Sequence, residues 1–365
     1  MPTESSVIEA LQPVQDPELN RSVVDLDMVK SVSVNDHLVR VTVAVPSQDY
    51  PLRGELRDRV SAAVAAVPGV SSVAVDLATM SEAEQKALVA RLRPGGGGSP
   101  ENPFLTARTR VLAVSSGKGG VGKSSVTTNL SIALARAGYS VAAVDADVWG
   151  FSMPRMLGVD RPPVVIDQLI VPPAAHGVKL VSMGFFARED QPVIWRGPML
   201  HKALEQFLTD VWWDEPQFLV VDMPPGTGDV SLSMAQFLPR AEVVVVTTPQ
   251  PAAQKVAQRA AYMAQKVNLT VTGVVENMSW FRGDDGKAYE IFGSGGGQEL
   301  ADALGVPLLG RVPLVPELRE GGDVGRPIIV VDPDNEASQA FTEIARRLYE
   351  DLAPKRVYRS ELKIM

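Results

Sequence analysis

A glycine-rich segment, residues 117–124, constrains the fold of this 365-residue chain more than any other feature. It lies between the apolar run 111–115 and a stretch in which Val126, Leu130 and Leu134 recur at helical spacing. Glycines let successive backbone N–H groups curl around an anion, and the first turn of a helix adds positive potential. A strand, a glycine-rich turn and a helix in this order predict a phosphate-binding loop at the carboxyl end of a parallel strand.

The side chains of this segment predict how it binds a nucleotide. Lys123 is expected to reach the β- and γ-phosphates, and the Ser124 hydroxyl is expected to ligate Mg²⁺. ATP and Mg²⁺ are therefore the expected cofactors. The residues expected to contact the nucleotide are Gly117, Lys118, Gly119, Gly120, Val121, Gly122, Lys123, Ser124 and Ser125.

Apolar runs alternate with helical segments through the larger part of the chain. This alternation predicts an α/β domain of the P-loop nucleoside triphosphatase type, with a mostly parallel sheet flanked by helices. Ligands bind such sheets at the carboxyl ends of the strands. The expected strands are residues 111–115, 141–144, 218–221, 243–247, 271–275 and 308–310.

Three aspartates come directly after expected strands, so they are predicted to lie at one edge of the sheet. Asp222 has the setting of an acidic residue that holds Mg²⁺, usually through its water shell, and the loop 224–229 suits sensing of the γ-phosphate. Asp145 and Asp147 follow another strand, and either could orient the attacking water. We assign that catalytic role to Asp147, and Mg²⁺ binding to Ser124, Asp145 and Asp222.

The segment 94–100 divides the chain, because its glycines favour a connector and its prolines discourage regular structure. Before it, apolar and polar residues alternate on both sides of Asn35-Asp36, which predicts a hairpin. Ser81 and Glu84 form a capping box that opens a helix. The expected organisation is a small α+β domain at 1–93, a linker at 94–103, a P-loop ATPase domain at 104–352 and a tail at 353–365.

Composition argues against several kinds of partner and site. The net charge of -8 gives no general attraction to nucleic acid. With no cysteine and three histidines, none spaced to share a helical face, this chain alone offers no disulfide, thiol nucleophile or thiolate metal site. The first residues lack the pattern of a signal peptide, and no apolar run is long enough to span a membrane. We therefore expect a cytoplasmic protein with no nucleic-acid partner and no membrane association.

A second lysine in the glycine-rich segment carries a family resemblance. Lys118 resembles the signature lysine of the deviant Walker A ATPases, which include MinD, ParA and the nitrogenase iron protein. From about residue 109 to residue 352 the chain resembles the Mrp/ApbC family of iron–sulfur cluster carriers, and 16–19 resembles the opening of the iron–sulfur assembly-type domain that begins many bacterial Mrp proteins. The motifs that carry the family resemblance are residues 145–152, 196–199, 222–229 and 276–279.

The resemblance implies a homodimeric ATPase that binds an iron–sulfur cluster between its subunits and passes it to client apoproteins. It also implies that Lys118 crosses the dimer interface to touch the nucleotide of the partner subunit. Lys118 is thus a predicted catalytic residue beside Lys123. By the same matching, Asn277 is expected to recognise adenine.

The chain departs from the family pattern where the cluster ligands belong. Mrp carriers place a Cys-x-x-Cys shortly after the Glu-Asn-Met-Ser motif, and those positions align with Gly283 and Gly286. The usual Cys-Pro of the small domain is Tyr50-Pro51. Carboxylates such as Asp284 and Asp285 are hard ligands and poor substitutes for thiolates on an iron–sulfur cluster.

Three functions remain open at this point. The first is an ATPase of the Mrp type in iron–sulfur protein maturation that works without holding the cluster itself, for example with a partner that supplies the thiolates. The second is a positioning ATPase like MinD or ParA, for which the tail 355–365 has some of the composition of a membrane-docking helix. The third is a regulatory module in which the nucleotide only switches the conformation.

Overall fold

The computed structural model describes residues 1–93, 98–99, 102–106, 108–147, 150–186, 197–226 and 229–352. The predicted tail 353–365 lies outside these residues. So do Val148, Trp149, Arg196, Thr227 and Gly228 of the family motifs. Of the predicted linker, residues 98–99 and 102–103 are described, and they belong to two short antiparallel strands, β4 (Gly98–Ser99) and β5 (Asn102–Thr106).

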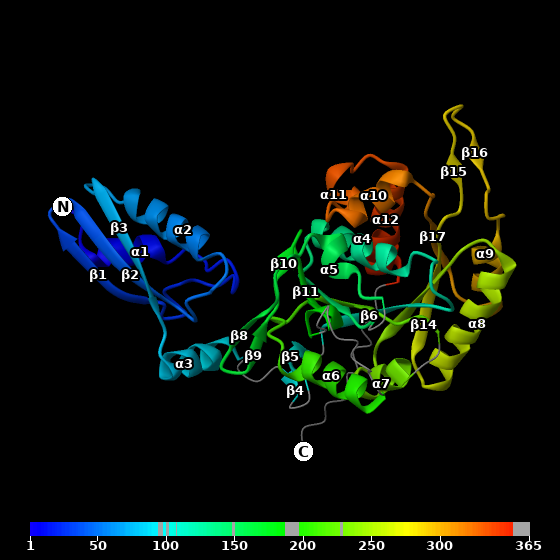
Figure 1. The fold of residues 1–365 in the computed structure, drawn as a ribbon, viewed down its shortest axis with the longest axis horizontal. Coiled ribbons are helices and arrows are strands. Elements are labelled where there is room, and N and C mark those ends of the chain that lie inside the picture. The colour runs from blue at the N-terminus through cyan, green and yellow to red at the C-terminus, as the bar shows by residue number, and fades with distance from the viewer. Residues whose placement is uncertain are drawn as a thin grey trace, which may run out of the picture.

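The N-terminal domain is built on a three-stranded sheet in the order β1-β2-β3 (Figure 1). Strands β1 (Val29–Asn35) and β2 (Leu38–Val45) pair antiparallel across the turn at Asp36, which confirms the predicted hairpin. Strand β3 (Ser72–Thr79) runs parallel to β2. The helices of this domain are α1 (Glu4–Leu11), α2 (Arg53–Ala65) and α3 (Glu82–Leu92), and the last begins at the predicted Ser81–Glu84 capping box.

The second domain contains an eight-stranded sheet in the order β10-β11-β7-β12-β6-β13-β14-β17. Every neighbouring pair is parallel except β10 with β11. This confirms the predicted α/β class, although β10 and β11 were missed. The bounds are β6 (Arg110–Ser116), β7 (Val141–Asp145), β10 (Ala174–Ala175), β11 (Val178–Ser182), β12 (Phe218–Asp222), β13 (Glu242–Thr247), β14 (Thr270–Glu276) and β17 (Leu308–Arg311).

Helices cover both faces of this sheet, with α4 and α12 on one side and α6 and α7 on the other (Figure 1). Alternate residues of β6 enter two different buried clusters, Val111 and Ala113 in one, Leu112 and Val114 in the other. Burial on both faces explains why the strands are almost continuously apolar. The helices are α4 (Lys123–Arg136), α5 (Met153–Leu157), α6 (Gly197–Thr209), α7 (Asp229–Phe237), α8 (Pro251–Lys266), α9 (Gly296–Leu304), α10 (Pro316–Asp323), α11 (Ile328–Val331) and α12 (Glu336–Arg346).

Short elements complete the domain. The hairpins are β8 (Val164–Ile166) with β9 (Leu169–Val171) and β15 (Phe281–Arg282) with β16 (Ala288–Tyr289). A 3₁₀ turn, η1 (Met183–Phe186), follows β11, and a π-helical turn, η2 (Arg347–Asp351), follows α12. Among the described residues, no helix is both long enough and apolar enough to cross a membrane.

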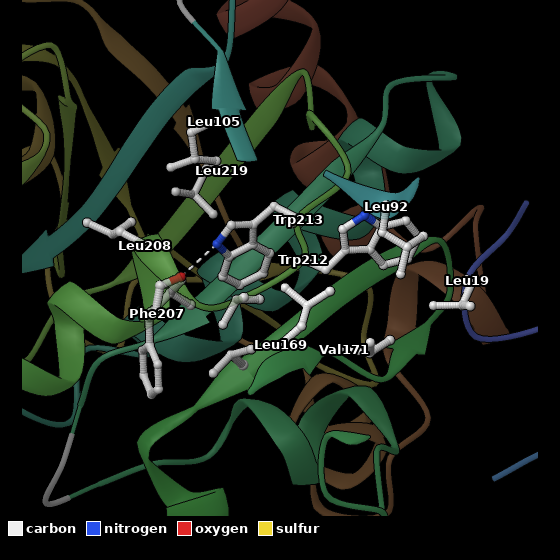
Figure 2. Packing of buried hydrophobic residues seen from close by; sticks show 14 of the residues in the cluster. Leu19, Leu92, Leu105, Leu169, Val171, Phe207, Leu208, Trp212, Trp213 and Leu219 are labelled. Carbon is white, nitrogen blue, oxygen red and sulfur yellow. Dashed lines mark hydrogen bonds between the residues drawn. The ribbon is translucent and has the colours of Figure 1, made fainter. Parts of the chain in front are cut away.

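Two adjacent tryptophans, Trp212 and Trp213, lie in the buried core near Leu219 of β12 (Figure 2). Trp212 and Trp213 are almost fully buried, and the Trp213 indole N–H donates to the Phe207 carbonyl over 2.7 Å. The same buried cluster includes Leu19 and Leu92 from the N-terminal domain. The two domains therefore share a continuous apolar contact.

A buried ion pair ties the start of the sheet to the C-terminal helix. Arg110 on β6 donates to both carboxylate oxygens of Glu242 on β13 over 2.7 Å each, and it also donates to the carbonyls of Leu348 and Leu352. The Arg110 side chain is 8% exposed and the Glu242 side chain is 17% exposed, so little water is available to replace a lost partner.

We expect Arg110→Met to lower the free energy of unfolding by about 3 kcal/mol, because it leaves the Glu242 carboxylate with the Thr272 hydroxyl but no cation and leaves two carbonyls without the Arg110 donor. Urea denaturation monitored by circular dichroism measures the change. Arg319→Ala, which removes an exposed pair with Asp323, is the matched control and should cost less than about 1 kcal/mol. Equal effects of the two variants would contradict the structural role given to Arg110.

Candidate functional site

The predicted phosphate-binding loop runs from the end of β6 to the start of α4, as the sequence indicates. Three of its glycines have a physical reason to be glycine. A Cβ on Gly117 would lie 2.3 Å from the Val256 carbonyl carbon, and Gly122 has a φ of +79° and the side chain of Asn277 against it. Gly120 also has a left-handed φ, +80°. At these positions a residue with a Cβ would clash with its neighbours or strain the backbone.

Lys123 lies at the centre of a buried polar cluster. Its Nζ is 2.8 Å from Asp222 Oδ2 and 3.6 Å from Asp147 Oδ2. The Asp222 side chain is fully buried, and the side chain of Lys123 is 7% exposed. A carboxylate at this depth needs a cation and donors to stay ionised. Lys123 is therefore already paired with carboxylates that a phosphate group must displace or share.

Two hydroxyl groups complete the contacts of Asp222. Ser124 Oγ donates to Oδ2 over 2.5 Å, and Thr127 Oγ1 donates to Oδ1 over 2.7 Å. The prediction did not include Thr127. Its position four residues after Lys123 could have shown it, because residues four apart lie on one helical face.

Asp145 lies beside Asp222, at the carboxyl ends of the neighbouring strands β7 and β12. Its Oδ2 accepts from the backbone N–H groups of Ser152 and Met153 and from the Ser182 hydroxyl, and its Oδ1 accepts from the N–H of Asp147. Burial, with the neighbouring Asp222 carboxylate as a further cause, raises the pKa of Asp145 to about 7. These contacts make Asp145 the group that fixes the start of α5.

Asp147 differs from Asp145 because it faces a cavity. Its Oδ1 accepts from the Gly150 N–H over 3.2 Å, and its Oδ2 points toward Lys123. The cavity has a volume of about 390 Å³, a size common for small-molecule sites. Its lining includes Lys118, Gly119, Gly120, Gly122, Lys123, Ser124, Ser125, Asp147, Ser152, Met156 and Pro225.

Asn277 packs against the loop from β14. Its Nδ2 donates to the Val121 carbonyl over 2.9 Å, while its buried Oδ1 has no hydrogen-bond partner. Glu276, next to it, accepts from the Gly297 N–H and the Ser279 hydroxyl and pairs with Arg311. The Glu276 carboxylate therefore has a structural role, whereas Asn277 Oδ1 has no donor in this structure.

Lys118 lies at the rim of the same cavity. Its Nζ is 3.5 Å from Gln250 Oε1, longer than the roughly 3.2 Å upper end of ordinary N–H···O hydrogen bonds. A lysine bound this weakly can reach another partner at little cost.

The geometry is compatible with Mg²⁺. In the described part of the chain, no group of three or more His, Cys, Asp or Glu side chains could hold a metal ion. Magnesium in nucleotide sites needs only one or two protein oxygens, because phosphates and water supply the rest. The Ser124 hydroxyl and the Asp222 carboxylate, which share a hydrogen bond at the cavity, are oxygen donors of that kind.

The positions aligned with cluster cysteines form a closed hairpin tip between β15 and β16. The Gly283 N–H donates to the Lys287 carbonyl, and Asp285 accepts from the Lys287 N–H and the Tyr289 hydroxyl. In the small domain, Tyr50 is 1% exposed and donates to Asp16 over 2.8 Å. Polar groups at the hairpin tip and at Tyr50 thus make internal hydrogen bonds, and neither place presents a soft ligand.

Comparison with known proteins decides the family. The family of NUBPL iron-transfer P-loop NTPases matches residues 107–349, and the iron–sulfur cluster assembly protein family matches residues 4–77. The chain belongs to the NUBPL iron-transfer P-loop NTPase family. An iron–sulfur cluster carrier protein of Mycobacterium leprae is 44% identical over 94% of this chain and 91% of the relative. One of Synechocystis is 42% identical over 95% of this chain and 97% of the relative.

Solved structures agree with this assignment. A nucleotide-binding protein of Archaeoglobus fulgidus in complex with ADP is 32% identical, with a TM-score of 0.55, and covers 64% of this chain and 93% of its own. The septum site-determining protein MinD of Pyrococcus horikoshii, complexed with Mg-ADP, is 25% identical with a TM-score of 0.51 over 67% of this chain and 98% of its own. The family membership and the P-loop fold predicted from the motifs are thus confirmed.

Removing the Thr127 hydroxyl tests whether it positions Asp222. We expect Thr127→Val to retain nucleotide binding at saturating Mg²⁺ but to need roughly tenfold more Mg²⁺, because a buried carboxylate oxygen loses its donor. Titration of Mg²⁺ against a fluorescent ATP analogue measures this. Thr127→Ser keeps the hydroxyl and should behave as the wild type, and an unchanged Mg²⁺ requirement in Thr127→Val would refute the positioning role.

Proposed function

We propose that this chain binds Mg·ATP in the cavity beside the loop and hydrolyses it. The observation that carries the proposal is the buried cluster of Lys123, Ser124 and Asp222 at the start of α4. Gly119, Gly120 and Gly122 would bring backbone N–H groups to the phosphates, beside the positive end of the helix. A triphosphate would take Lys123 away from its two aspartates.

The other predicted site residues receive roles by the same reasoning. Asp147 faces the cavity and is the proposed group that orients the attacking water. Asn277 is the proposed adenine contact, because its unpaired Oδ1 can accept from the exocyclic amine. When bound, Mg²⁺ would neutralise charge on the β- and γ-phosphates, with Ser124 and Asp222 as its protein ligands.

A Mg²⁺ role for Asp145 stays a prediction. Both of its oxygens already accept backbone or side-chain donors, and ligation would require it to release some of them.

We propose that the functional unit is a homodimer in which Lys118 reaches the nucleotide of the opposite subunit. The weak contact of Lys118 with Gln250 and its place at the cavity rim support this arrangement. A cation that arrives from the second subunit can stabilise the transferring phosphoryl group only after dimerisation.

We propose that nucleotide turnover serves the assembly or transfer of iron–sulfur clusters to client apoproteins. Relatives named iron–sulfur cluster carrier proteins align over nearly the whole chain, and both families matched concern iron transfer or cluster assembly. The cluster is the cargo of this process. Because this chain has no cysteine, a partner protein must supply the thiolates.

The positioning ATPase is the weaker alternative. The MinD structure aligns at 25% identity over 67% of this chain, whereas a carrier of Mycobacterium bovis aligns at 45% identity over 93% of it. A cytoplasmic location and the domain boundaries stay predictions.

We expect Lys118→Ala to leave nucleotide affinity within about threefold of the wild type but to lower hydrolysis at least tenfold. Phosphate release and titration with a fluorescent ATP analogue measure the two quantities. A mixed dimer provides the sharper test, since Lys118→Ala and Lys123→Ala subunits should complement at one of the two sites. Absence of recovered activity despite confirmed subunit exchange would refute action from the opposite subunit.

We expect the purified chain, offered iron and sulfide without oxygen, to hold no stable [4Fe–4S] cluster, because it presents no soft sulfur ligand. Absorption spectroscopy with iron and sulfide analysis gives the result. A Gly283→Cys/Gly286→Cys/Tyr289→Ala variant is the positive control, since a Cβ on Gly283 would otherwise lie 2.8 Å from the Tyr289 ring. A stoichiometric cluster in the unmodified chain would overturn the assignment of ligands to a partner.

A further inference from the structure

The loop 16–21 of the small domain has a rigid, prebuilt shape. Asp16 Oδ1 accepts from the backbone N–H groups of Glu18 and Leu19 and from the Tyr50 hydroxyl, at 2.8 to 3.0 Å. Asn20 has a left-handed φ of +49°, and the Asp16 N–H donates to the Arg21 carbonyl. The loop therefore displays Glu18, Leu19 and Arg21 in a fixed arrangement.

All three displayed side chains contact the P-loop domain or share its core. Glu18 pairs with Arg161 over 2.7 Å, and its side chain is 1% exposed. Arg21 pairs with Asp214 over 2.7 Å and lies over the Trp212 ring. Leu19 belongs to the buried cluster that contains Trp212. A carboxylate as buried as Glu18 is costly without its cation, so this face of the small domain is matched to the P-loop domain.

Arg161 is connected to the nucleotide cavity by a short stretch of chain that includes helix α5. The N–H groups of Ser152 and Met153 at the start of α5 donate to Asp145, and Met156 in the same helix lines the cavity. Helix α5 ends at Leu157, and its C-cap residue, Gly158, lies three residues before Arg161. A shift at the cavity end of α5 is therefore transmitted to the residue that pairs with Glu18.

A phosphate that entered the cavity would change the partners of Lys123 at this end of the connection. In this structure Lys123 is shared between Asp222 and Asp147, and Asp147 begins the segment that leads into α5. A triphosphate competes for Lys123 and adds negative charge beside Asp147. The electrostatic potential at the start of α5 would therefore change strongly whenever the nucleotide is exchanged.

We propose that the loop 16–21 is a docking surface for the P-loop domain of the same chain, and that ATP binding releases it through α5 and Arg161. The docked arrangement accompanies pairing of Lys123 with Asp147, and the released arrangement accompanies pairing of Lys123 with phosphate. The proposal rests on the nucleotide binding proposed above. In the proposed ATP-bound protein, the face of the small domain that carries residues 16–21 becomes accessible.

Hydrogen exchange of the full chain, followed by mass spectrometry with and without a non-hydrolysable ATP analogue and Mg²⁺, tests the release. We expect residues 12–28 to exchange faster when the analogue is bound. Arg161→Ala should show fast exchange without nucleotide and no further response. By reciprocity it should bind the analogue about fivefold more tightly, because undocking no longer opposes binding.

Matched variants separate this effect from a general loss of stability. Arg40→Ala removes an exposed pair with Asp76 within the small domain and should change neither readout. The charge exchange Glu18→Arg/Arg161→Glu should restore slow exchange and the response to nucleotide. Arg21→Gln, which removes the more exposed ion pair with Asp214 and leaves the pair of Asp214 with Lys179 in place, should give a smaller change in the same direction.

Exchange in residues 12–28 that slows or does not change with bound analogue would overturn the proposal. Faster hydrogen exchange of residues 12–28 with unaltered affinity for the analogue in Arg161→Ala would also overturn it. Docking of the loop would then be independent of nucleotide binding. Failure of the wild type to bind the analogue at all in a fluorescence titration would instead refute the proposed nucleotide binding, so the two failures are distinguishable.

Discussion

The contact between Lys123 and Asp222 is the interaction on which the site depends. Burial of the carboxylate would be unfavourable without the lysine and the hydroxyl groups of Ser124 and Thr127. The same burial makes the lysine a strong attractor for phosphate, because little water screens its charge. The cluster therefore keeps a cation at the loop that can be shared between the protein and a nucleotide.

Sheet topology brings these groups together. Strand β6 lies between β12 and β13, and β12 lies beside β7, so the carboxyl ends of three neighbouring strands deliver the loop, Asp222 and Asp145 to one edge. Asp145 in turn fixes the start of α5, because it accepts hydrogen bonds from the backbone N–H groups of Ser152 and Met153. The hairpin that contains Gly283 and Gly286 offers no thiolate, because the chain has no cysteine. In the function proposed above, the nucleotide site and the ligands of the cluster therefore belong to different chains.

Local patterns predicted the parts of the structure that depend on neighbouring residues. The glycine-rich loop, the hairpin at Asp36 and the cap at Ser81 each rest on a few adjacent side chains, and the structure has each of them. Sequence did not predict β11 or the contact of Glu18 with Arg161. Both depend on packing between distant segments, and a short apolar run or a lone acidic residue carries no sign of its partner. Three of the four donors to Asp145 were missed for the same reason, because they come from Ser152 and Met153 at the start of α5 and from Ser182 at the end of β11.

The central claim, that this loop binds ATP through a buried lysine, is tested most directly by titrating a fluorescent ATP analogue with Mg²⁺ into the Lys123→Ala protein. Loss of the cation leaves Asp222 and Asp147 facing the phosphates without compensation, so we expect affinity to fall more than about 100-fold while the fold is retained. Lys118→Ala, which removes a lysine from the same loop but outside the buried cluster, is the control. Unchanged affinity in a folded Lys123→Ala protein would contradict the account and place the nucleotide elsewhere.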